Sequence, residues 1–245
     1  MKDYLIDTHA HLDMLSEFDI SGVGKVIVPS VEIKTMETVI NLSKNNNVYS
    51  MVGIYPSEAK TYSEEVEQKM IEYAKNARVV AVGEIGLDYY WDKTFIDLQK
   101  DVFIKQIKLA NKLELPIVVH DREAHKDCFD ILKEYNKSSK VLFHCFSGSV
   151  EFMKECTNLG WYIAIGGVVT FKNSRKMKEV AQAVPLEKLV LETDAPYLTP
   201  VPFRGKENKP AYVKFVAEEI AKLRDMQIEE IIDVTTTNAE EFFGI

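Results

Sequence analysis

Eight short apolar runs, most of them rich in Val and Ile, alternate with longer amphipathic segments along the 245 residues. The runs cover residues 4–6, 23–28, 49–54, 79–82, 117–119, 141–143, 161–165 and 189–191. Nearly continuous hydrophobicity over so few residues is typical of parallel strands that are buried on both faces. Their alternation with helices predicts a parallel α/β sheet, and eight strands favour closure into a barrel over an open sheet.

The segments between these runs have helical patterns at residues 35–45, 63–76, 96–113, 125–136, 149–158, 174–183 and 208–223, and a tail at 227–242 predicts one or two more short helices. The sequence contains neither G-x-G-x-x-G nor G-x-x-x-x-G-K-[ST], the two glycine-rich motifs that bind nucleotide phosphates. Their absence argues against a nucleotide-binding fold. The length suits a barrel of about 250 residues. We therefore predict one domain over residues 1–245, a distorted (β/α)8 barrel of the TIM type with a metal site at its C-terminal mouth.

The amino-acid composition indicates which binding partners and which cellular compartment to expect. With 30 Lys and Arg against 38 Asp and Glu, the net charge of −8 argues against a large basic surface for nucleic acid. No apolar run approaches the roughly 20 residues of a membrane span, and the first residues lack a signal-peptide core. The three cysteines form no C-x-x-C pair, as expected in a reducing compartment. We predict a cytoplasmic monomer that does not bind membranes.

Histidines and carboxylates, the residue types that bind metal ions, follow several of the apolar runs. Four of the five histidines and two carboxylates stand at strand ends: His9, His11, Glu84, His120, His144 and Asp194. The carboxyl ends of all strands of a closed α/β barrel meet at one mouth, so these side chains would converge. A single histidine at a strand end is more often a structural residue, but clustered carboxylates need cations nearby. The pattern therefore predicts a metal site.

The spacing suggests how two ions could be held. His9 and His11 are two residues apart, so in extended backbone both side chains face the same way, and Asp194 could complete their site. Glu84 could bridge to a second ion held by His120 and His144. A bridging carboxylate with imidazoles around it suits Zn²⁺, Mn²⁺ or similar metals.

Six motifs in this order resemble the TatD-like metal-dependent deoxyribonucleases, which are amidohydrolase-type barrels. They are IDTHAHLD at residues 6–13, VGEIGLDY at 82–89, PIVVHDREA at 116–124, HCFSG at 144–148, ETDAPYL at 192–198 and PFRGKENKP at 202–210. Together the motifs span nearly the whole chain. One position departs from the family pattern, since Tyr55 stands in a third-strand motif that usually carries histidine.

The resemblance implies a hydrolase with two divalent ions per chain, Zn, Mg or Mn. One ion would be held by His9, His11, Glu84 and Asp194, and the other by Glu84, His120 and His144. Asp194 would also be the general base, so the catalytic residues would be Asp194 and Glu84. All six metal-ligand positions of the family carry ligand-type residues in this chain, so Tyr55 does not affect the predicted metal site. It affects only a substrate contact that the family's histidine would make at this position.

Other residues in these motifs are candidates for substrate binding. Arg122, Arg204 and Lys206 are the best candidates for binding phosphate, since a guanidinium grips phosphate through two hydrogen bonds. The aromatic segment 89–91 could stack a nucleobase or could simply pack its loop against a helix.

Two more carboxylates stand two residues before a predicted ligand, Asp7 before His9 and Glu192 before Asp194, so in a strand each would face the same side as that ligand. Asp7 and Glu192 could orient the histidines from behind, or could be ordinary hydrogen-bonding residues at strand ends.

These features predict a cytoplasmic nuclease whose substrate is DNA. Because the chain is acidic, we expect exonuclease-like cleavage of short or single-stranded DNA ends, which needs only the metals and a few basic residues. One alternative is a barrel hydrolase of a small-molecule phosphoester, amide or lactone, since a fold does not determine its substrate. Another is a metal-binding interaction protein without turnover, against which the retained Asp194 argues.

Overall fold

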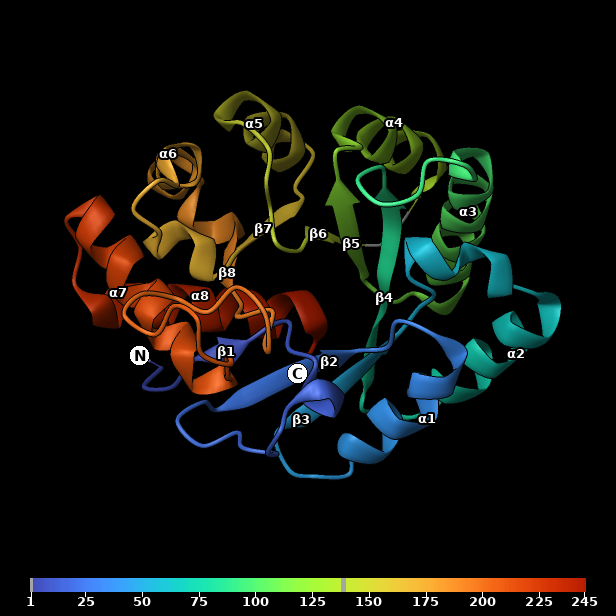
Figure 1. The fold of residues 1–245 in the computed structure, drawn as a ribbon, viewed down its shortest axis with the longest axis horizontal. Helices are drawn as coiled ribbons and strands as arrows, with labels where there is room; N and C mark the ends of the chain where they lie inside the picture. The colour runs from blue at the N-terminus through green and yellow to red at the C-terminus, as the bar shows by residue number, and fades with distance from the viewer. Residues whose placement is uncertain (1, 138–139) are drawn as a thin grey trace. The chain divides into compact units, whose positions relative to one another are not determined.

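The computed structural model describes residues 2–137 and 140–245, which form two compact units. Unit 1 contains the N-terminal residues up to Val28 together with His144–Ile245, and unit 2 is Pro29–Phe143. Strands and helices alternate along the chain in unit 2 and over residues 150–224 of unit 1 (Figure 1). None of the helices in the described residues has the length and hydrophobicity to cross a membrane.

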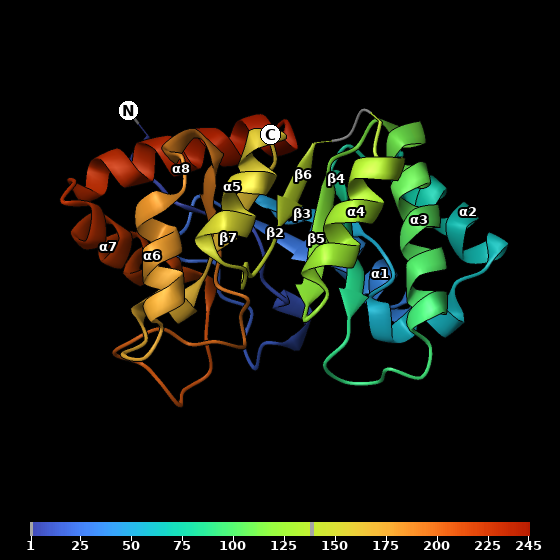
Figure 2. The same cartoon turned by 90° about the horizontal axis from the view of Figure 1, so that it is seen from above.

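Unit 2 is built on the strands β3 (Val48–Val52), β4 (Val79–Asp88), β5 (Ile117–Arg122) and β6 (Val141–Phe143). Each pairs in parallel with the next, and the helices of the unit are α1 (Ile33–Leu42), α2 (Glu64–Tyr73), α3 (Ile96–Leu113) and α4 (His125–Tyr135). Helices α3 and α4 lie side by side (Figure 2). Parallel pairing brings the carboxyl ends of β4 and β5 to the same edge of the sheet.

Unit 1 contains the strands β1 (Ile6–Asp7), β2 (Lys25–Pro29), β7 (Tyr162–Ile165) and β8 (Leu189–Leu191). Its helices are α5 (Val150–Asn158), α6 (Arg175–Ala183), α7 (Val213–Arg224) and α8 (Ile228–Phe243). β1 pairs in parallel with β2, and β7 with β8. The Thr8 amide donates to the Leu191 carbonyl at 3.1 Å, so the end of β1 lies beside the end of β8.

The largest difference from the sequence prediction is the length of β4, which continues past the expected residue 82 to Asp88. Gly83, Glu84 and Gly86 interrupt the apolar pattern, yet all ten residues of the strand are buried. The pairing with β5 also shifts register between Val82 and Ile85. Glu84 therefore lies within the strand rather than after it.

Gly86 is required where β4 and β5 come close together. It has a φ of +147°, and a Cβ atom there would lie 2.0 Å from the carbonyl oxygen of His120. We expect Gly86→Ala to lower the free energy of unfolding by about 3 kcal/mol or more, because backbone must move. Gly160→Ala is the matched control, since Gly160 has φ +81° with open space around it and should cost only about 1–2 kcal/mol. Equal urea midpoints for the two variants would contradict this prediction.

The C-terminal region also differs in detail from the prediction. The helix expected from residue 208 is preceded by a short 3-10 turn, Pro210–Tyr212, and α7 begins at Val213. The reason is Asn208, a buried loop residue whose amide donates to the Thr193 and Tyr197 carbonyls. The tail forms the single helix α8 rather than two short helices.

Glu240 joins three parts of unit 1. Its carboxylate accepts hydrogen bonds from the Lys2 ammonium, from the Tyr4 hydroxyl at 2.5 Å and from the Lys25 ammonium at 2.8 Å. Burial alone would raise the pKa of Glu240, but these three hydrogen bonds lower it from its ordinary value of 4.5 to about 2. The N-terminal segment and β2 are thereby attached to α8.

We expect Glu240→Gln to reduce the free energy of unfolding at pH 7 by about 1–3 kcal/mol, since hydrogen bonds to a charged acceptor are lost. A lowered folded-state pKa stabilises the fold above the unfolded-state value, so the difference from the parent should shrink as pH falls from 4.5 towards 2. Urea unfolding at several pH values measures this. Glu155→Gln on α5, an exposed position, is the control. A pH-independent difference would show that the charge of Glu240 does not matter.

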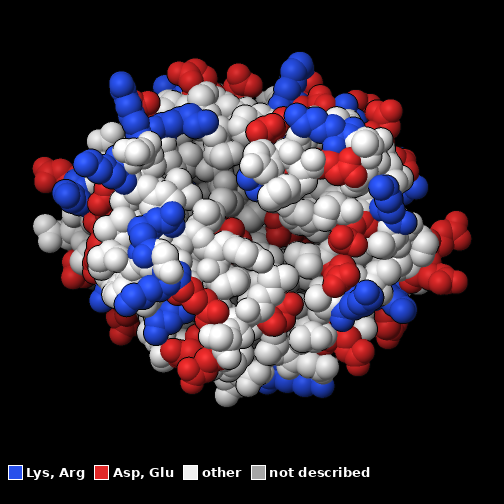
Figure 3. Space-filling view, in the orientation of Figure 1, with Lys and Arg blue, Asp and Glu red and all other residues white. Residues whose placement is uncertain are grey.

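Charged side chains of both signs are mixed on the surface. On the face shown in Figure 3, Lys and Arg side chains lie among Asp and Glu side chains. This distribution agrees with the net charge of −8.

Candidate functional site

Unit 1 brings three buried ligand-type side chains together. The candidate ligand atoms of His9, His144 and Glu192 all lie within 4.8 Å of one another. His9 follows β1, His144 follows β6 and Glu192 follows β8. The two imidazole rings are stacked, with centroids 3.9 Å apart and an interplanar angle of 14°. Segments more than 180 residues apart in the sequence therefore form one candidate metal site.

Glu192 shows that this group suits a cation. Its Oε1 accepts the Cys145 amide at 2.6 Å, and its Oε2 is 3.7 Å from Nδ1 of His144, beyond hydrogen-bonding distance. Oε2 is buried and accepts no hydrogen bond from the described residues. Burying an oxygen that accepts no hydrogen bond is costly unless a cation lies beside it. With imidazole nitrogens beside it, the donor set is one that Zn²⁺ or Mn²⁺ accepts.

Asp194 lies beside the two N-terminal histidines. Its Oδ1 is 3.5 Å from Nε2 of His11 and 4.0 Å from Nε2 of His9. Burial alone would raise the pKa of Asp194, but a hydrogen bond with His11 and the charges of His144, His11 and His9 lower it overall. The residue has a φ of +58°, a conformation that is uncommon outside glycine and often found at functional sites. Asp194 is therefore an ionised carboxylate held against imidazoles.

Asp7 is a hydrogen-bonding residue at a strand end. Its carboxylate accepts the Thr193 amide at 2.9 Å, the Thr193 hydroxyl at 2.5 Å and the His9 amide at 3.3 Å. Burial raises the pKa of Asp7 to about 8, against the lowering effect of these donors. Of the two roles considered for Asp7, orienting a histidine ring or hydrogen-bonding at a strand end, the contacts favour the second. It joins the loop after β8 to the backbone of His9.

Unit 2 places Glu84 of β4 beside His120 of β5. Oε1 of Glu84 is 2.7 Å from Nδ1 of His120, and Nε2 of the same ring is 3.1 Å from Oδ2 of Asp88. Burial alone would raise the pKa of Asp88, but the hydrogen bond with His120, its charge and two backbone amides lower it to about 2. The ring of His120 is thus held between two carboxylates.

Tyr55, the residue that departs from the family pattern, lies against the same histidine. Its hydroxyl is 3.0 Å from Nε2 of His120 and donates to Oδ2 of Asp88, also at 3.0 Å. Burial, followed by the negative charges of Glu84 and Asp88, raises the pKa of Tyr55 far above its ordinary value. The phenol is therefore neutral and fixes the position of Asp88 and His120.

The predicted phosphate-binding residues fall into two places. Arg122 is exposed at the end of β5 in unit 2, next to Tyr90 and Trp91. Arg204 and Lys206 lie in the loop before α7 of unit 1. The Arg204 guanidinium stacks on Phe171 at 3.9 Å and donates to the Thr199 carbonyl, while Lys206 is exposed.

The aromatic segment divides into two kinds of residue. Tyr89 is half-buried and its hydroxyl donates to Asp127 of α4 at 2.7 Å, so it packs the loop against a helix. Tyr90 and Trp91 are exposed. Packing of the loop against a helix is therefore observed for Tyr89, and stacking of a nucleobase stays a prediction for Tyr90 and Trp91.

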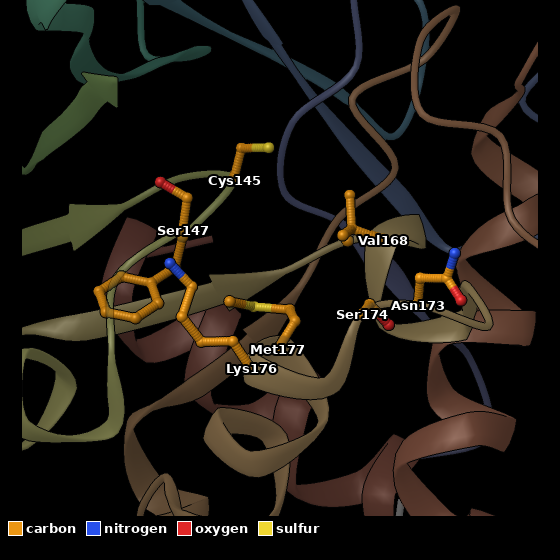
Figure 4. A pocket seen from close by; sticks show the side chains of 9 residues that line it. Cys145, Ser147, Val168, Asn173, Ser174, Lys176 and Met177 are labelled. Atoms are coloured by element: carbon orange, nitrogen blue, oxygen red, sulfur yellow. The ribbon is translucent and has the colours of Figure 1, made fainter. Parts of the chain in front are cut away.

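Unit 1 contains a cavity of about 290 Å³ whose lining includes Cys145, the residue after His144 (Figure 4). Cys145 and Ser147 line it from the segment after β6, and Asn173, Lys176 and Met177 line it from the region of α6. Cys145 is also the residue whose amide binds Glu192. Most of the lining surface is apolar, and Ser147, Asn173 and Lys176 are among the polar side chains that a small anionic or hydroxylated group could contact there.

Two residues of the site are given a larger role by the structure than by the sequence. Glu192 lies among the candidate ligands instead of behind them, and Asp88 contacts His120 directly. The signal for Asp88 was its even spacing from Glu84, since residues two or four apart in a strand share a face. Glu192 carried the same signal relative to Asp194.

Comparison with known proteins identifies the family. A model described as TatD related DNase matches residues 6–244. The chain is 41% identical over 253 residues to the uncharacterized metal-dependent hydrolase YabD of Bacillus subtilis (strain 168), covering 98% of this chain and 99% of that relative. It is 35% identical over 258 residues to the uncharacterized metal-dependent hydrolase YcfH of Escherichia coli (strain K12), with coverage of 99% and 96%.

The structure is also similar to a solved one. It matches the crystal structure of YjjV, a TatD homolog from Escherichia coli K12, with a TM-score of 0.91 and 31% identity, covering 98% of each chain. This match and the alternation of eight parallel strands with helices confirm the predicted fold class, the (β/α)8 barrel. Because the family model and both relatives extend along nearly the whole chain, the protein belongs to the TatD-related DNase family of metal-dependent hydrolases.

Proposed function

We propose that the protein hydrolyses phosphodiester bonds of DNA and acts as an exonuclease on short, single-stranded or frayed ends. The observation that carries this proposal is the ionised Asp194 carboxylate beside His9 and His11, next to the buried group of His9, His144 and Glu192. Such a site offers a cation-binding cluster and a proton acceptor together, which is what metal-assisted hydrolysis requires.

In this proposal the site residues have three roles: binding the metal ions, accepting a proton and positioning a histidine ring. His9, His11, Glu84 and Asp194 would hold one ion, and Glu84, His120 and His144 the other, with Glu192 as an additional candidate ligand. Two divalent ions would polarise the phosphate and make a water molecule acidic enough to attack it. Asp194 would accept the proton from that water, for which its lowered pKa keeps it ionised. Asp88 and Tyr55 would hold the His120 ring in place.

Charge supports action at DNA ends rather than along a duplex. A protein that grips long duplex usually carries a basic stripe, whereas this chain has a net charge of −8 with mixed charges on the face in Figure 3. Arg122, Arg204 and Lys206 would contact the few phosphates of a terminal segment, since guanidinium groups bind phosphate through paired hydrogen bonds.

The test is incubation of protein loaded with Mn²⁺ or Zn²⁺ with single-stranded DNA labelled at either end. We expect a ladder of products shortened from one end, and EDTA should abolish it. Far-UV circular dichroism should stay nearly unchanged in EDTA, since the apolar core does not depend on a metal. Absence of cleavage by fully metallated protein would overturn the proposal.

A small phosphoester is a second candidate substrate, favoured by the cavity that Cys145 and Lys176 line. Its volume of about 290 Å³ is at the lower end of the range for small-molecule sites. A panel of small phosphomonoesters and phosphodiesters, assayed beside oligonucleotides, separates the two candidates. Higher kcat/KM for a small phosphoester than for any oligonucleotide would favour the second.

A further inference from the structure

We propose that Tyr90, Trp91 and Arg122, which we call the aromatic platform, bind the terminal unpaired base of a single-stranded nucleic acid by stacking. The inference rests on the proposed function, because it specifies what part of the substrate is held. Tyr90 is 48% exposed and Trp91 is 69% exposed, which is unusual for side chains of this size. Their exposure in adjacent positions leaves apolar surface that a ligand can cover.

The three side chains are arranged around the guanidinium. Its carbon lies 3.9 Å from the centroid of the Tyr90 ring and 5.4 Å from that of Trp91. The two rings are 4.8 Å apart and nearly perpendicular, at 86°. An edge-to-face pair of this kind keeps the rings in fixed orientations, and the more exposed Trp91 offers area on which a base can stack.

Arg122 adds a phosphate-binding edge to the aromatic platform. It makes no ion pair within the described residues, although Glu123 beside it pairs with Lys93 at 3.8 Å. Stacking on Tyr90 uses the flat face of the guanidinium, and the N–H groups around its rim remain able to donate to a phosphate. Base and backbone of one nucleotide can therefore be bound by neighbouring side chains.

Asp88 connects the aromatic platform to the candidate metal ligand in the same unit. Its Oδ1 accepts the backbone amides of Tyr90 at 2.9 Å and Trp91 at 3.3 Å, while its Oδ2 is 3.1 Å from Nε2 of His120. One buried carboxylate thus positions both the loop that carries the aromatic rings and the histidine. A base stacked on the aromatic platform would be held close to His120 and Glu84.

This geometry selects an unpaired base. Only a base at a strand end or in a single strand can turn a free face towards a protein ring, and every base has such a face. The aromatic platform should therefore bind with little sequence preference, and a base-paired duplex end should bind less well than a frayed one.

The first experiment measures binding with metal-loaded protein and a phosphorothioate oligothymidylate, which resists cleavage. Trp91 is exposed and the other tryptophan, Trp161, is only 7% exposed, so bound DNA should quench the emission of Trp91. An abasic phosphorothioate strand of equal length should cause little quenching. Equal quenching by both strands would overturn the role of the base.

The second experiment measures affinities of variants by fluorescence anisotropy of the labelled oligothymidylate. Trp91→Ala should weaken binding about five- to a hundredfold, while Phe18→Ala, at an aromatic position with 44% exposure outside the aromatic platform, should leave it unchanged. Arg122→Lys should also weaken binding, because lysine keeps the charge but loses the planar stack, whereas Arg175→Lys should not.

The results distinguish this inference from the proposed function. Unchanged affinity in Trp91→Ala would overturn the aromatic platform even if the protein cleaves DNA. Base-dependent binding without any cleavage by metallated protein would leave the aromatic platform standing and overturn the proposed hydrolysis.

Discussion

Replacing Glu84 with glutamine should remove hydrolysis and lower the metal content from about two ions per chain towards one. Glu84 is 2% exposed, and its Oε1 is 2.7 Å from Nδ1 of His120. Glutamine keeps the size and a hydrogen bond but lacks the charge that two ions would share. A partner behind a metal ligand is typically worth about 10–100-fold, so loss of a shared ligand should cost more than that.

The measurement is metal content by elemental analysis beside kcat/KM at saturating metal. Glu123→Gln is the control, since Glu123 is an exposed carboxylate that follows β5 in the same unit. It should keep both metal and activity. Full metal content and full activity in Glu84→Gln would show that this carboxylate does not bridge the ions.

Replacing Asp194 with asparagine should lower kcat by about 10²–10⁴-fold while the fold is kept, because asparagine cannot accept the proton of the attacking water. The lowered pKa of Asp194 keeps the parent carboxylate ionised near neutral pH. Part of the loss would come from weaker metal binding, and excess metal should restore that part. The part due to proton transfer should remain at any metal concentration.

Asp225→Asn provides a matched control for the backbone. Asp225 has a φ of +52°, close to the +58° of Asp194, so both substitutions put asparagine into the same left-handed conformation. Its kcat should equal that of the parent protein. Near-parent kcat in a fully metallated Asp194→Asn protein would mean that another group accepts the proton.

The fold class could be predicted because the period of hydrophobicity is a local property of the chain. The runs at 141–143 and 189–191 became β6 and β8 with the predicted bounds, and α3 matches residues 96–113. β4 was predicted too short because Gly83, Glu84 and Gly86 look like a strand end in sequence. Whether such residues continue a strand depends on the space and partners that neighbouring backbone provides, and no local pattern contains that information.

For the candidate site, too, some features could be predicted from the sequence and others only from the structure. The sequence alone determined the family and predicted a metal site, because histidines and carboxylates follow the apolar runs and the motifs around them resemble those of one family. Only the tertiary structure decided how the carboxylates are used: Asp7 binds backbone, Glu192 lies among the candidate ligands and Asp88 joins His120 to Tyr90 and Trp91. The physical reason is that residue type sets what a group can bind, whereas its actual partners depend on ångström-scale distances between segments far apart in the chain.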